Sequence, residues 1–110
     1  MIKDAIQMNK SEQAQIKELK ANIDGVHRFT DGTDKYGMLI IARGELLFFQ
    51  ENDKGLLCEI SARYSLINPK TIKQWDNGDK ISEEEKDQIL AKIIHFYKIA
   101  YKNDLTVYKE

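Results

Sequence analysis

The sequence predicts an α+β fold, arranged as a single domain over residues 1–110. Apolar residues recur at helical spacing near both ends of the chain, whereas the middle alternates or runs continuously apolar, as strands do. The six glycines stand singly between these runs, where consecutive strands would turn. We expect an antiparallel meander sheet of four to six strands, covered on one face by a C-terminal helix and also by an N-terminal helix.

The N-terminal helix is predicted over residues 10–22. Ile16, Leu19 and Ile23 share one helical face, and neither Gly nor Pro occurs before Gly25. Polar residues interrupt the apolar seam earlier in the chain. Residues 1–8 are therefore expected to fray.

Four strands are predicted in the middle of the chain. Residues 26–30 alternate, and turn formers follow them. Residues 36–42 and 45–50 are apolar runs separated by Gly44, which suits the tight turn of a hairpin. Residues 56–64 show the clearest alternation, with one face apolar and the other polar.

Two shorter strands are expected after Pro69 breaks this meander. Residues 71–75 read as an edge strand, where the missing proline donor is tolerated, and residues 105–108 alternate like a final strand. Between them, Ser82 and Glu85 form a capping box that opens the last helix. Acidic residues in its first turns and Lys98 and Lys102 in its last turns complement the helix dipole.

Composition and charge exclude several classes of protein. The chain is 42% hydrophobic and 32% charged, as globular proteins are, and its formal net charge is −1. Such a charge creates no global field that would hold nucleic acid or an anionic membrane. The lone Cys58 excludes an internal disulfide framework and favours a reducing compartment. Without a secretory or membrane-spanning apolar run, a cytoplasmic protein is expected.

The residues that could take part in catalysis or metal binding have structural interpretations. His95 falls on the solvent side of the last helix, and His27 lies in a strand beside Phe29. Cys58 sits on an apolar strand face, where burial would raise its pKa and leave it inert. The carboxylates of residues 83–87 serve helix capping. We therefore expect no enzyme, no metal site and no cofactor.

A surface around the only tryptophan remains as a candidate binding site. Trp75 lies beside Asp76 and Asp79, and tryptophan is enriched where proteins bind each other. Arg63 and Tyr64, on the preceding strand, would extend this patch. The alternative interpretation is that Trp75 caps the core beside the last helix.

The same segment carries a family resemblance. Ile72-Lys73-Gln74-Trp75-Asp76, then Gly78, Ile81-Ser82 and Glu85, resembles the C-terminal half of small immunity proteins from bacterial polymorphic toxin systems. The resemblance implies a cytoplasmic, stoichiometric inhibitor that binds a cognate toxin domain and needs no catalytic residue. It covers the chain from Asn68 onward. Immunity proteins against nucleases are often acidic, so a net charge of −1 leaves the toxin class open.

Two alternatives belong to other classes of function. The first is a non-catalytic interaction domain, homodimeric through an exposed edge strand such as residues 71–75 or 105–108. The second is a small-ligand binder with a pocket between sheet and helices, in which Tyr97, Tyr101 and His27 supply polar groups. A solution dimer would favour the first, and a ligand-induced rise in melting temperature the second.

Overall fold

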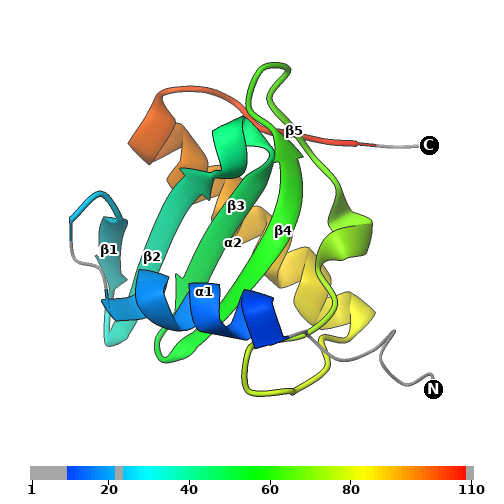
Figure 1. Ribbon diagram of the computed structural model, residues 1–110. Coiled ribbons are helices and arrows are strands. Elements are labelled where there is room, and N and C mark those ends of the chain that lie inside the picture. Colours follow the sequence, from blue (N-terminus) through cyan, green and yellow to red (C-terminus); the bar gives the residue numbers. More distant parts are fainter. Residues whose placement is uncertain (1–9, 22–23, 109–110) are drawn as a thin grey trace.

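The computed structural model describes residues 10–21 and 24–108 and has the predicted α+β fold. In this part of the chain, six strands form one sheet in the order β1-β2-β3-β4-β5-β6 (Figure 1). The helices and strands are α1 Lys10–Ala21, β1 His27–Asp31, β2 Asp34–Ile41, β3 Leu46–Glu51, β4 Lys54–Ser61, β5 Leu66–Ile67, α2 Glu83–Tyr101 and β6 Thr106–Val107. Among the described residues, the 3₁₀ helix η2 Ala42–Gly44 connects β2 to β3, and the 3₁₀ helix η3 Pro69–Thr71 lies between β5 and α2. The expected fraying of residues 1–8 lies outside the described residues.

The sheet is an antiparallel meander from β1 to β5, as predicted, but its last pair is parallel. Leu66 and Ile67 of β5 pair with Thr106 and Val107 of β6 in parallel register. The chain reaches β6 after crossing the sheet through α2, and such a crossover permits parallel pairing. The predicted final strand is thus present, although it makes the sheet mixed.

The main core lies between α2 and one face of the sheet. Five residues of α2 are buried there: Ile89, Leu90, Ile93, Phe96 and Tyr97. They pack on the sheet through residues such as Met38, Leu47 and Phe49, none of which is accessible to solvent. Ser82 caps α2 as predicted, because its Oγ accepts a hydrogen bond from the Glu85 N–H at 3.1 Å.

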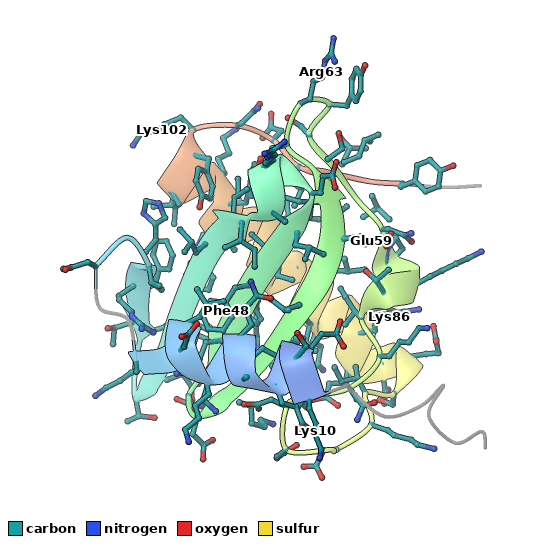
Figure 2. All side chains as sticks on the ribbon, in the orientation of Figure 1. Lys10, Phe48, Glu59, Arg63, Lys86 and Lys102 are labelled. Carbon is teal, nitrogen blue, oxygen red and sulfur yellow. The ribbon has the colours of Figure 1, made fainter. Side chains whose placement is uncertain are left out.

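The α1 helix covers the opposite face of the sheet, which corrects the expectation that both helices share one face. Ile16 and Leu19 pack with Val26 on Phe48, which Figure 2 shows beside α1. Phe48 and Phe49 are sequence neighbours, so their side chains point to opposite faces of β3. Because both are fully buried, the sheet needs a covering layer on each side.

Residues 71–75 do not form the predicted edge strand. Within this segment, Gln74 makes an isolated bridge with Lys80. The Trp75 N–H donates to the Asp79 carbonyl at 2.9 Å, so the chain turns back on itself before α2. The upstream η3 is capped by Asn68, whose side chain accepts a hydrogen bond from the Lys70 N–H, and Pro69 at the first helical position favours this helix.

Candidate partner-binding surface

Trp75 belongs to the core. Its side chain is 1% exposed, and its indole Nε1 donates to Glu85 Oε2 at 3.0 Å. Lys54 Nζ lies 4.8 Å from the centre of the indole ring and covers it from the other side of the loop. The core interpretation is therefore the one that fits, and Trp75 offers no accessible surface to a partner.

Asp76 is also committed to internal contacts. Its Oδ2 accepts from Lys20 Nζ at 2.7 Å and its Oδ1 accepts from the Gly55 N–H at 3.0 Å. These bonds fasten the loop to α1 and to β4. Asp79 differs, because it is exposed and its carboxylate contacts only the side chain of Asn77 within the loop.

Arg63 and Tyr64 lie at the other end of the molecule. Figure 1 shows the turn between β4 and β5 at the top, whereas residues 76–80 form the loop at the bottom. Both side chains are exposed, and the Arg63 guanidinium lies 5.3 Å from the centre of the Tyr64 ring. The five residues expected to bind a partner therefore do not form one surface.

Three turns meet where Arg63 and Tyr64 lie, and we call this region the apical end: residues 42–45, 62–65 and 102–104. The Ala62 N–H donates to the Gly44 carbonyl at 2.9 Å, which joins the first two turns. Asn103 Nδ2 donates to Ser65 Oγ at 2.8 Å, which joins the end of α2 to the second. The apical end is thus one connected platform.

The exposed charged side chains of this platform are three basic groups and two carboxylates, and one aromatic ring lies beside them. Arg43, Arg63 and Lys102 are exposed, as are two carboxylates, Glu45 and Asp104. Tyr64 is 66% exposed, more than any other large hydrophobic side chain in the described residues. Figure 2 shows Arg63 and Lys102 at this end, pointing away from the sheet.

Backbone strain also gathers at the apical end. Ala42, Arg43, Ser65 and Lys102 have φ of 54°, 58°, 56° and 58°, in the left-handed region. Among the described residues, the only other non-glycine residue with positive φ is Asn52. Such conformations cost roughly 1 kcal/mol each and persist where surrounding contacts enforce them, frequently at functional sites.

Arg43 and Lys102 were not predicted from the sequence as members of this surface. Arg43 precedes the hairpin glycine Gly44, and Lys102 precedes the turn former Asn103. These neighbours mark each position as a turn. Nothing in the sequence indicates that the two turns meet beside Arg63, because that proximity comes from the strand register and from the length of α2.

The other residues that could take part in catalysis or metal binding lie outside the apical end. His95 is exposed on α2 as predicted, and Cys58 is buried, which raises the pKa of its thiol to about 12. His27 is half-buried, with its ring 5.0 Å from that of Tyr101. Within residues 10–21 and 24–108, no three His, Cys, Asp or Glu side chains gather as a metal-binding group.

The polar groups suggested for a small-ligand pocket are engaged or enclosed. The Tyr101 hydroxyl accepts a hydrogen bond from the Ile40 N–H at 3.0 Å, at a position of β2 that β1 does not reach. Tyr97 is buried, and burial raises the pKa of both hydroxyls. A groove of about 520 Å³ does lie beside α2, but it is lined by Phe29, His95, Phe96 and Ile99 among others, and not by Tyr97 or Tyr101.

Comparison with known protein families, curated proteins and solved structures finds no match to this chain. None of the helices in the described residues is both long and apolar enough to cross a membrane. The contacts and exposed groups of the molecule itself therefore carry the functional assignment.

Proposed function

We propose that this chain is a non-catalytic binding protein, specifically a cytoplasmic immunity protein that neutralises a cognate bacterial toxin domain by stoichiometric contact. The resemblance of residues 72–85 to immunity proteins supports the choice of partner. In this segment Trp75 and Glu85 are bonded to each other and Asp76 holds Gly55. The resembling residues thus support the fold, and the contact surface lies elsewhere.

The exposed Arg63–Tyr64 pair is the main observation that supports the proposed contact surface. Tyrosine and arginine are enriched among residues that dominate binding energy, because each offers a large contact area with a polar group. The pair stands on a platform joined by hydrogen bonds to two other turns. A preordered surface loses little conformational entropy when a partner binds.

The charge of the apical end indicates the chemistry of the partner. Arg43, Arg63 and Lys102 outnumber Glu45 and Asp104 among its exposed charged side chains, and Asp104 pairs with Lys98 at 2.9 Å. An acidic surface on the toxin domain would complement this charge and accelerate association. Binding should accordingly weaken as salt concentration rises.

Calorimetric titration tests this proposal. The probe is the toxin domain encoded by the gene immediately upstream, titrated with the wild-type chain and with Tyr64→Ala and Arg63→Glu. We expect one-to-one binding and loss of toxin activity, with affinity about tenfold to a hundredfold weaker in each variant. Tyr108→Ala removes another exposed tyrosine, and Lys80→Glu reverses a charge at the opposite end. Both controls should bind as the wild type does.

Two results would contradict different parts of the proposal. Tight binding that neither Tyr64→Ala nor Arg63→Glu weakens would remove the apical end as the contact surface. A toxin domain that stays active in the presence of excess wild-type chain would remove the inhibitor function itself.

A further inference from the structure

The strand β1 forms an edge of the sheet. It pairs with β2 on one side, and in the described residues no strand pairs with its other side. Figure 1 shows β1 at the left edge of the sheet. An edge strand presents main-chain donors and acceptors that can pair with another strand.

Thr30 directs its main-chain groups toward this outer edge. Its partner in the ladder is Lys35, whose N–H donates to Asn52 Oδ1 at 3.0 Å and whose carbonyl accepts the Asn52 N–H at 2.7 Å. Thr30 and Lys35 are therefore a non-hydrogen-bonded pair, in which the main-chain groups of each residue point away from the other strand. This orientation alternates along the strand, so the main-chain groups of Phe29 and Asp31 point toward β2 instead.

The groove of about 520 Å³ runs beside this edge on the α2 side of the sheet. Its floor is aromatic, because Phe29 stacks on Phe96 with ring centres 4.6 Å apart. Its wall includes Ala91, His95 and Ile99, which recur every fourth residue on α2, and Ile99 is 47% exposed. A strand added to β1 would place alternate side chains against this groove.

A second copy of β1 fits this edge in one register. A two-fold antiparallel pairing that uses the outward main-chain groups can be centred on residue 28, 29 or 30. Centring on 28 sets Arg28 against Arg28 of the second copy, and like charges directly opposite are destabilising. Centring on 30 leaves Asp31 opposite an aromatic ring, that of Phe29.

Centring on Phe29 places complementary residues opposite each other on the α2 side of the sheet, and it sets Arg28 opposite the neutral Thr30. His27 of each copy lies opposite Asp31 of the other, so an imidazole N–H can donate to a carboxylate at two symmetric places. Phe29 meets Phe29 on the axis, as an aromatic cross-strand pair. His27, Phe29 and Asp31 alternate onto the same face as the groove, since Phe29 packs on α2 there.

We propose that two copies of this chain associate through antiparallel pairing of their β1 strands, centred on Phe29, which joins the two sheets into one. We choose a second copy over an unrelated strand because His27 of one copy is complementary to Asp31 of the other. This edge differs from the edges at residues 71–75 and 105–108 considered from the sequence. The inference is independent of the toxin-binding proposal, because it uses a different surface.

Sedimentation velocity over a wide concentration series tests the association. The wild-type chain should show a concentration-dependent monomer–dimer equilibrium. Thr30→Pro removes an outward N–H without breaking the β1–β2 ladder and should weaken the dimer about tenfold or more. Val107→Pro is the matched control on β6, because the N–H groups of Thr106 and Tyr108 donate to Ser65 and Ile67 and the Val107 N–H points away from β5. It should leave the dimer unchanged.

A charge exchange between His27 and Asp31 separates pairing from general destabilisation. His27→Glu sets two carboxylates opposite each other, whereas His27→Gln keeps the site neutral. His27→Glu alone should be monomeric over the concentration range used. The double variant His27→Glu/Asp31→Lys restores opposite charges, and its dimer dissociation constant should be within about threefold of the wild-type value. A wild-type chain that stays monomeric throughout, or a double variant that fails to recover, would overturn the proposal.

Discussion

The indole N–H of Trp75 donates to the Glu85 carboxylate at 3.0 Å, which ties the only tryptophan to the first turn of α2. The main-chain N–H of the same glutamate donates to Ser82 Oγ at 3.1 Å. In a capping box the glutamate side chain returns to the cap residue. Here the Glu85 carboxylate bonds to the buried Trp75 instead, so one residue both takes part in capping the helix and fixes the loop before it.

Replacing Glu85 with alanine should expose the role of this bond. The Glu85→Ala variant leaves the Trp75 N–H buried without its acceptor, and we expect the free energy of unfolding to fall by about 1–3 kcal/mol. Urea titration followed by the fluorescence of the single tryptophan measures it. Glu84→Ala removes a neighbouring exposed carboxylate from the same turn and should change stability by less than about 0.5 kcal/mol. Equal stability of the two variants would contradict the role assigned to the bond.

Asp76 is expected to contribute to stability rather than to binding. Asp76→Ala removes the acceptor of the Gly55 N–H and the partner of Lys20, so the free energy of unfolding should fall by about 1–3 kcal/mol. Lys20→Met removes the ion pair and the hydrogen bond from Lys20 Nζ to the Asp53 carbonyl, and it should cost less because both contacts are at least partly exposed. Denaturant unfolding of both variants gives the comparison, and a smaller loss for Asp76→Ala than for Lys20→Met would refute it.

Local sequence signals predicted the elements that depend on neighbouring residues. The capping residue Ser82 and the helical period of α2 lie within a few residues of what they specify. Ile72 and Trp75 misled the strand prediction at residues 71–75 because both are apolar and both are buried. They anchor an irregular loop to the core, and their separation of three residues would have placed them on opposite faces of a strand.

The candidate surface could be predicted only in part, for a different reason. Alternation predicted a strand through Tyr64, but β4 ends at Ser61, so Arg63 and Tyr64 stand on the turn that follows it. Their proximity to Arg43 and Lys102 requires the register of β2 with β3 and the length of α2. The side of the sheet that α1 covers was equally inaccessible. Apolar residues on both faces of β3 show that two layers are needed, but not which helix supplies each.

Gly55 should resist substitution because α1 crosses β4 at this position. A Cβ there would lie 2.8 Å from Ile16 Cγ2 and 3.2 Å from Phe48 Cε1, so α1 would have to move. We expect Gly55→Ala to lower the free energy of unfolding by about 1–3 kcal/mol. The control is Gly37→Ala, whose closest contact would be the end of the flexible Arg28 side chain. Thermal unfolding that ranks Gly37→Ala as the more damaging would contradict this account.

The backbone conformation of Lys102 at the apical end lowers the stability of the fold. This residue ends α2 in the left-handed conformation, with φ of 58°, a position that glycine adopts without strain. Lys102→Gly should therefore raise the free energy of unfolding by up to about 1 kcal/mol. The same substitution at Lys98, inside the helix, should lower it by about 1 kcal/mol. Denaturant titration of the two variants tests this, and a loss of stability in Lys102→Gly would show that the backbone there is not strained.

The Cys58 thiol should make the fold sensitive to alkaline pH. Burial, and to a smaller extent Glu59, raises its pKa from 9.0 to about 12. Because the folded state holds the thiol proton more tightly than the unfolded state, this contribution to stability is complete below pH 9 and is lost as the pH rises from 9 toward 12. The loss should approach about 1.4 kcal/mol per pH unit within that window.

The Cys58→Val variant isolates this effect, since valine keeps an apolar side chain at the site and cannot ionise. The pKa values of Tyr36, Tyr97 and Tyr101 are raised by burial as well, so both proteins should lose some stability at high pH. The difference between their unfolding free energies should be constant below pH 9 and should then shift in favour of the valine variant. Denaturant titrations at a series of pH values measure this difference. Parallel curves across the whole series would mean that Cys58 ionises as readily in the fold as outside it.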